Sequence, residues 1–206
     1  MRKAALLLPV CLLLAGCIIF DKKSEAVTFH QLVAPAAGPT RAAPSVYVPR
    51  AIVPSGLRRA NLVLLDDAGN VRIEDGHRWI APLDRALAEA VGRHLTARSG
   101  LPVAHQTPPD AHLVLLLTVD RMEIAAAPRQ DRPLLSLPGM SGPPDNAVLQ
   151  LTYRLERDDG ALIRAETVLR SRALANREPA TFVRAQSANL AEIAEQIAQA
   201  LPAPSR

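Results

Sequence analysis

The chain has 206 residues, of which 49% are hydrophobic and 21% charged, and its formal net charge is +4 at pH 7. This length suits one domain that buries about 70% of the surface of its unfolded chain. Without Arg2 and Lys3 at the extreme amino terminus, 22 basic residues stand against 20 acidic ones. Aromatic residues make up 3% of the chain, so the basic face with stacking aromatics that nucleic-acid binding requires is missing, and no nucleic-acid partner is expected.

Residues 1–16 have the organisation of a secretory signal peptide. Arg2 and Lys3 precede an apolar run from Ala4 to Ala15, which is shorter than the roughly 20 residues needed to span a bilayer and fits a signal-peptide core. Leu14-Ala15-Gly16-Cys17 then matches the bacterial lipobox. We therefore expect cleavage between Gly16 and Cys17, a diacylglycerol thioether on Cys17, and an N-linked acyl chain such as palmitate on the new terminus.

Lipidation of Cys17 would leave the mature protein without a free thiol, because Cys11 is lost with the signal peptide. Disulfides, thiolate metal sites and cysteine nucleophiles are then excluded. Two or three acyl chains give lasting membrane attachment, whereas one chain gives only marginal binding. Residue 18 is Ile, not the Asp that retains lipoproteins in the inner membrane in enteric-type sorting. The expected location is the periplasmic face of the outer membrane, with residues 17–28 as a lipidated tether and residues 29–202 as the folded domain.

The first half of the domain contains short extended segments. Val27 to Val33 is typical of a strand. Ser45 to Val53 is also extended, and Pro49 within it indicates an edge or a bulge. The segments 61–65 and 71–74 flank the turn sequence DDAGN and predict a hairpin.

A helix is predicted to open within Arg78 to Leu83, with Pro82 in its first turn. Leu83, Leu87, Val91 and Leu95 then recur every four residues, and Ser99-Gly100 ends the helix. We expect Trp79, Pro82 and Leu83 to form a structural anchor at the strand-to-helix junction. A ligand-stacking role for Trp79 is the alternative.

The second half predicts three strands and a helix. The apolar run 113–117 within His112 to Ala125 predicts a central strand covered on both faces. Residues 147–157 alternate, with Leu149, Leu151, Tyr153 and Leu155 inward, and a turn at Asp159-Gly160 leads into 161–172. There we expect Ile163, Ala165 and Leu169 on the buried face. Residues 181–201 form the last helix, whose apolar stripe comprises Phe182, Leu190, Ile193, Ile197 and Leu201.

This order of elements predicts an α+β fold: an antiparallel or mixed β-sheet with two helices packed on one face. Between the central strand and the last hairpin lies a Pro- and Gly-rich loop, residues 127–145, which contains Leu134, Leu135, Leu137 and Met140. A structureless loop of this length is usually functional or disordered. Its apolar residues could contact a partner, lipid or another subunit, or the loop could fold back on its own domain.

No catalytic or metal-binding residues are predicted. The five histidines, at positions 30, 77, 94, 105 and 112, show neither HxxxH nor HExxH spacing. No GxSxG elbow, P-loop or dinucleotide fingerprint is present. The acidic pairs 66/67 and 158/159 fall in turns, where aspartate serves the backbone. The chain is therefore expected not to be an enzyme and to need no cofactor beyond its covalent lipid; a hydrolase would require a histidine, an acid and a nucleophile to converge in the fold.

Behind the lipobox, residues 29–201 resemble the auxiliary lipoproteins of ABC-type and MCE intermembrane transport systems, of the PqiC/YmbA type. The resemblance rests on FHQL, VPSGLRR, HRWIAPLDRAL, LVLLLTVDRMEI and FVRAQSANLAEIAEQIAQAL, which begin at positions 29, 53, 77, 113 and 182. Phe29 stands where family members often have Tyr, and the 127–145 loop is longer than usual.

The resemblance implies a non-enzymatic adaptor at the outer membrane that supports envelope integrity. Its partners would be an MCE-domain protein, which bridges the periplasm and carries phospholipid or other apolar molecules, and the inner-membrane permease of the same system. Contact with a tubular partner is compatible with a ring-like homo-oligomer. The alternative function is a periplasmic lipid- or small-ligand-binding lipoprotein with an apolar cavity under the 127–145 loop.

Overall fold

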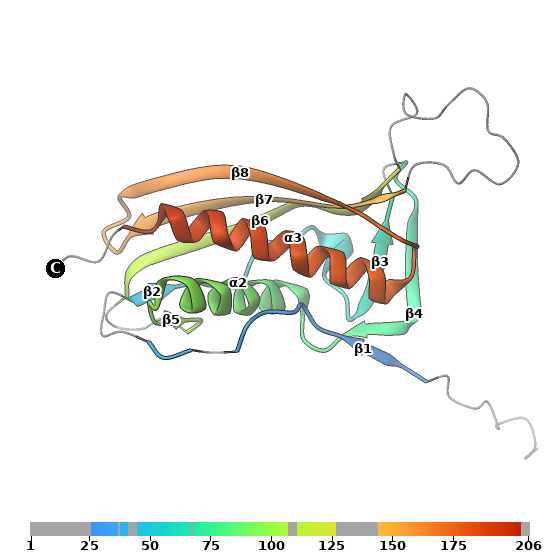
Figure 1. The fold of residues 1–206 in the computed structure, drawn as a ribbon, viewed down its shortest axis with the longest axis horizontal. Helices are drawn as coiled ribbons and strands as arrows, with labels where there is room; N and C mark the ends of the chain where they lie inside the picture. Colours follow the sequence, from blue (N-terminus) through green and yellow to red (C-terminus); the bar gives the residue numbers. More distant parts are fainter. Residues whose placement is uncertain are drawn as a thin grey trace, which may run out of the picture.

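The structure, a computed structural model, describes residues 26–36, 38–40, 45–66, 68–106, 111–126 and 144–202. Most of these residues belong to strands and two long helices (Figure 1). In chain order the elements are β1 (Thr28–His30), β2 (Ser45–Tyr47), the 3₁₀ turn η2 (Ser55–Leu57), β3 (Asn61–Leu65), β4 (Val71–Trp79), α2 (Leu83–Ser99), β5 (Val103–Ala104), β6 (Ala111–Ala125), β7 (Asn146–Arg157), β8 (Leu162–Ala173) and α3 (Pro179–Ala200).

The strands form two mixed sheets, which confirms the α+β class while dividing the strands in a way that the sequence did not indicate. The larger sheet has the order β5-β2-β6-β7-β8, and the smaller has the order β1-β4-β3. Strands β6, β7 and β8 are antiparallel, whereas β2 runs parallel to both of its neighbours and β1 runs parallel to β4. In Figure 1, α3 and α2 lie beside each other along the long strands, and the smaller sheet lies at one end.

The core lies between the helices and one face of β6 and β7. The alternation predicted for β7 is confirmed, because Leu149, Leu151, Tyr153 and Leu155 are buried. Leu151 and Tyr153 lie opposite Val119 and Leu117 of β6, so apolar residues of both strands share the covered face. The stripe of α3 packs here through Phe182, Leu190, Ile193 and Ile197.

The prediction that residues 113–117 are covered on both faces was wrong. Leu113, Leu115 and Leu117 are buried, but Leu116 is 36% exposed. Both helices pack on one side of this part of the sheet, so the side chain of Leu116 lies on the uncovered side. Only after the register shift near Asp120 do consecutive residues of β6 become buried, where a bridge from Asp66 to Ile124 joins the strand to the end of β3.

The predicted inner face of β8 was also wrong. Ile163, Ala165 and Leu169 are exposed, and Val168 is the buried residue. The register of β8 against β7 explains the difference. Val168 lies opposite the buried Leu151, so Val168 and the residues two and four positions away from it face the helices. Apart from Val168 these are mainly charged, namely Arg164, Glu166, Arg170 and Arg172, and they form polar contacts with α3 or with one another.

The first long helix begins later than predicted. Strand β4 runs to Trp79, whose backbone N–H donates to the carbonyl of Ala60. The helix α2 starts at Leu83, with Pro82 at the N-cap rather than in the first turn. Its stripe of Leu83, Leu87, Val91 and Leu95 is buried as expected, and Gly100 closes the helix with a left-handed φ of 71°.

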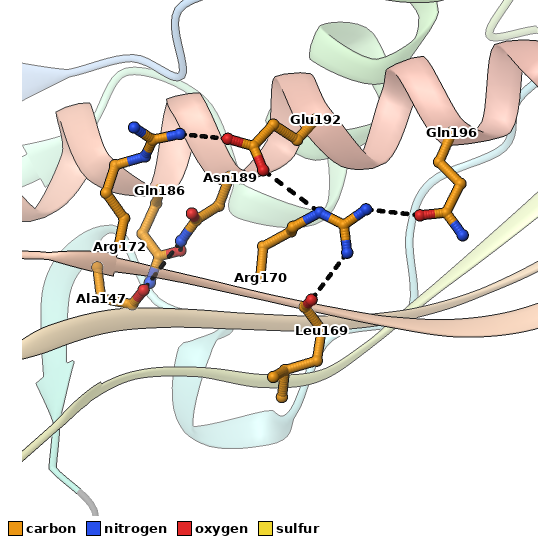
Figure 2. A network of polar contacts seen from close by, with 8 residues as sticks. All are labelled: Ala147, Leu169, Arg170, Arg172, Gln186, Asn189, Glu192 and Gln196. Carbon is orange, nitrogen blue, oxygen red and sulfur yellow. Dashed lines mark hydrogen bonds and ion pairs between the residues drawn. The ribbon is translucent and has the colours of Figure 1, made fainter. Parts of the chain in front are cut away.

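Two buried amide side chains attach α3 to β7 (Figure 2). Asn189 donates from Nδ2 to the carbonyl of Ala147 over 2.9 Å, and Gln186 donates from Nε2 to the carbonyl of Val148 over 3.0 Å. Asn189 also lies 3.4 Å from Oε1 of Gln186. Because both amides are at most 1% exposed, these bonds fix where the helix sits along the strand.

We predict that Asn189→Ala lowers the free energy of unfolding by about 2 kcal/mol, because it removes a buried hydrogen bond and leaves the Ala147 carbonyl without this donor. Urea unfolding followed by circular dichroism measures the change. Gln199→Ala, at an exposed position of the same helix, is the matched control and should change stability by less than about 0.5 kcal/mol. Equal losses in the two variants would contradict a specific role for Asn189.

Candidate functional site

The predicted site residues fall into two groups. Gly16 and Cys17 of the lipobox, and Leu134, Leu135, Leu137 and Met140 of the 127–145 loop, lie outside the described residues. Trp79, Pro82 and Leu83 are described and meet where β4 passes into α2. Trp79 and Leu83 are 6% and 3% exposed, and Ile80 N–H donates to the carbonyl of His30. This junction therefore connects the first described strand with the start of α2.

Two histidines that are 47 residues apart form a pair on the smaller sheet. Nε2 of His30 and Nδ1 of His77 are 2.8 Å apart, and the rings stack with a centroid distance of 5.1 Å. Burial lowers the pKa of His30, and the neighbouring charge of His77 lowers it further. The sequence carried no spacing signal for this pair, since only the parallel pairing of β1 with β4 brings the two residues together.

The other histidines are dispersed. Nδ1 of His105 lies 3.0 Å from the carbonyl oxygen of Val48, and His112 is exposed on β6. His94 is half-buried on α2, and burial lowers its pKa. Within the described ranges, no group of three or more His, Cys, Asp or Glu side chains could hold a metal ion.

One face of the larger sheet is not covered by either helix. Across it runs a row formed by Ile52, Thr118, Thr152 and Thr167, whose members lie opposite one another on adjacent strands. The exposed apolar side chains of this open face are Ile52 (61%), Leu116 (36%), Ile163 (36%) and Leu169 (49%). Charged side chains share this face: Arg154 lies opposite Leu116 and pairs with Glu156 at 2.7 Å, and Asp120 accepts a hydrogen bond from Thr152 over 2.7 Å. The open face thus offers apolar, hydroxyl and charged side chains together.

A second set of charged side chains lies on the helix side of the same sheet. A cleft of about 410 Å³ between β8 and α3 is lined mostly by polar residues. Arg170 contacts Glu192 at 3.3 Å and Gln196 at 2.6 Å, and Arg172 also pairs with Glu192 (Figure 2). Arg164 binds Glu166 at 2.8 Å and lowers the pKa of that carboxyl group. Because these charges are paired internally, the cleft is a structural contact rather than a ligand site.

The described residues give little support to the alternative function, which requires an apolar ligand cavity. The space between the helices and the sheet is filled by side chains of 0–2% exposure, including Leu87, Leu115, Tyr153 and Phe182. A cavity close to the ends of the 127–145 loop, lined by Ile124 among others, measures about 200 Å³. Typical small-molecule sites hold roughly 300–1,000 Å³, so this cavity is small for a lipid chain.

Most of the chain matches a known protein family. Residues 30–198 match the family model for the ABC-type transport auxiliary lipoprotein component. The chain belongs to this family. The match extends from the last residue of β1 nearly to the end of α3, so it takes in both sheets and both helices. No curated protein matches the sequence.

Solved structures share the fold of this family member. The crystal structure of an uncharacterised protein matches with a TM-score of 0.65 at 18% identity, over 85% of this chain and 98% of the other. Protein XCC0632 from Xanthomonas campestris, of the DUF330 family model, matches with a TM-score of 0.62 at 16% identity, over 84% and 93% of the two chains. Within the described residues, no helix combines the length and the apolar character needed to cross a membrane.

We predict that stability falls as the pH is lowered below the ordinary imidazole pKa of about 6.5. The folded protein binds a proton at His30 less readily than the unfolded chain does, so acid favours unfolding down to the lowered pKa of the folded state. His30→Gln removes this contribution. The loss of unfolding free energy between pH 7.5 and pH 5 should therefore be smaller in H30Q than in the unsubstituted protein.

Urea unfolding at the two pH values provides the measurement. His112→Gln, which removes an exposed histidine, is the matched control. It shows whether the effect is specific to the buried His30 or follows the loss of any imidazole. An identical pH dependence in H30Q and the unsubstituted protein would show that His30 does not couple protonation to folding.

Proposed function

We propose that this protein is a lipid-anchored adaptor at the periplasmic face of the outer membrane, in an MCE-containing ABC-type system for intermembrane lipid transport. The family match over residues 30–198, which begins shortly after the lipobox cysteine, carries the proposal. The adaptor docks the MCE-domain protein, which is linked to the inner-membrane permease, and thereby supports envelope integrity. A ring-like homo-oligomer around a tubular partner belongs to the same proposal.

The tether limits how far the domain stands from its membrane. Residues 17–28, fully extended, reach about 40 Å. The first described strand, β1, is held in parallel register with β4. The acyl chains on Cys17 contribute about 0.8 kcal/mol per buried CH₂, so attachment resists the pull of a docked partner.

The open face is the surface that we assign to the MCE-domain protein. Its apolar residues Ile52, Leu116 and Leu169 are exposed by 36–61%, and they are interleaved with threonines and with the Arg154–Glu156 ion pair. On the helix side, Glu192 pairs with Arg170 and Arg172, and Glu195 pairs with Arg98. The core of a protein interface is depleted in charged residues and enriched in apolar ones. The open face carries the exposed apolar side chains of the larger sheet, so we assign the contact to it rather than to the helix side.

Site-specific photocrosslinking in living cells tests this contact. A benzophenone side chain at position 116 or 52 should crosslink the MCE-domain protein, identified by mass spectrometry. The same probe at position 184, an exposed position of α3, is the matched control and should not crosslink it. An MCE-domain protein captured only from position 184, or from none of the three, would refute the assignment.

We also predict that Cys17→Ser prevents lipid attachment and cleavage by the lipoprotein peptidase. Intact-mass spectrometry of the purified wild-type protein should give a chain that starts at residue 17 with added acyl mass. The variant should retain residues 1–16 and no acyl mass, and should disappear from outer-membrane fractions on a sucrose gradient. Wild-type protein with an unmodified chain beginning at Met1 would exclude the anchor.

A further inference from the structure

A cavity of about 420 Å³ lies at the amino end of α2, where the residues that join β4 to α2 form part of its lining. It combines three arginines with a mostly apolar wall. We call it the arginine cavity. Its lining includes Arg50, Arg58, Arg59, Trp79, Ile80 and Pro82.

Three separate segments bring the arginines together. Arg50 follows β2, where Ala51 N–H donates to the carbonyl of Asp84 at the start of α2. Arg58 closes the turn η2 through its backbone N–H, and its side-chain Nε donates to the carbonyl of Val53 over 3.1 Å. This bond fixes the position of the Arg58 side chain. Arg59 comes next in the chain and lies beside it in the lining.

The charges of the arginine cavity are not balanced. Asp84 is the acidic residue in the lining, and its Oδ2 lies 3.6 Å from Nη1 of Arg50. Arg59 makes no ion pair or side-chain hydrogen bond with any residue that the structure describes. Three guanidinium groups against one carboxylate leave an excess of positive charge, unlike the cleft beside α3, where the arginines are paired. Such an arrangement favours a phosphate group, which guanidinium binds with parallel hydrogen bonds.

The wall of the cavity points to an amphiphile rather than a bare ion. Ile80 is 62% exposed although it follows the buried Trp79, and Pro82 continues the apolar surface. A volume of about 420 Å³ exceeds what a phosphate ion needs and fits a small ligand with an apolar part. A ligand with phosphate next to hydrocarbon would use both parts of the lining.

We propose that the arginine cavity binds the headgroup of an anionic phospholipid. The phosphate contacts the guanidinium groups of Arg50, Arg58 and Arg59, and the glycerol and first acyl carbons lie against Ile80. Free phosphate shares the anionic chemistry but not the apolar contact. This site is distinct from the open face, and it would let the tethered domain hold lipid at the membrane whether or not an MCE partner is docked.

Isothermal titration calorimetry on the full lipidated protein in a neutral detergent tests the proposal. Dihexanoyl phosphatidylglycerol, a short-chain soluble lipid, should bind saturably with one site per chain. Dihexanoyl phosphatidylcholine and inorganic phosphate should each bind at least about tenfold more weakly, because one lacks net charge and the other lacks the apolar contact. Equal binding of the two lipids would overturn the proposal, and phosphate binding as tight as that of the anionic lipid would assign the site to free phosphate instead.

Matched variants locate the binding. R50Q/R59Q should weaken phosphatidylglycerol binding by at least about tenfold. R157Q/R184Q removes two exposed arginines elsewhere and should leave the affinity within about twofold. Arg58 is kept in both because its Nε bond supports η2, and thermal unfolding checks that each variant folds. Equal losses in the two double variants would show general electrostatic attraction and refute the site.

Ile80→Ser separates the two parts of the lining. It should weaken phosphatidylglycerol binding by severalfold and leave inorganic phosphate binding unchanged, because Ile80 supplies only the apolar contact. An unchanged lipid affinity in I80S would contradict the amphiphile assignment. The adaptor role is tested by crosslinking to a protein, so failure of lipid binding and failure of that role are observed separately.

Discussion

The structure depends on the apolar inner face of β6 and β7, which has to be removed from water. Its leucines and Tyr153 are at most 4% exposed, and a fully buried leucine side chain contributes on the order of 1.5–3 kcal/mol. Burial by itself does not fix where a helix lies along a strand, because apolar contacts are not directional. The amides of Gln186 and Asn189 supply that direction by binding the carbonyls of Val148 and Ala147. With α3 placed and α2 packed beside it, the opposite face of the sheet is left uncovered.

The sequence predicted those elements whose side chains follow a simple periodicity. The α+β class, the alternation of β7 and the stripes of both helices are confirmed, because in each case the buried side is also the apolar side. Strand β8 broke this rule. It lies at the edge of the sheet next to the polar flank of α3, so its helix-facing positions hold Arg170 and Arg172, and Leu169 faces solvent. The contact between His30 and His77 could not be predicted, since it needs the parallel pairing of two strands that are far apart in the chain.

The lipid-attachment residue could be predicted from the sequence, whereas the candidate binding surfaces could not. A lipobox is a local motif, so Cys17 could be named from adjacent residues alone, and it stays a prediction. The arginine cavity could not be predicted from the sequence, because Arg50 is separated from Arg58 and Arg59 along the chain. The three residues line one cavity only because β2, η2 and the start of α2 come together in the fold. The motifs VPSGLRR and HRWIAPLDRAL, which carry the family resemblance, form most of its lining.

The tether and both proposed binding surfaces connect through a short stretch of backbone. β1 follows the tether and pairs with the end of β4, and the carbonyl of His30 accepts a hydrogen bond from Ile80 N–H over 2.9 Å at the rim of the arginine cavity. Ile52 on the open face is bound on both sides to β6, through Leu117 and Val119, and Arg50 of the cavity stands two residues before it. A partner that binds at Ile52 would thus contact a segment that backbone hydrogen bonds hold to β6 and, through Ala51, to α2. Such a segment resists displacement, so we expect the arginine cavity to keep its shape whether the open face is free or occupied, and the proposed lipid and protein partners not to compete.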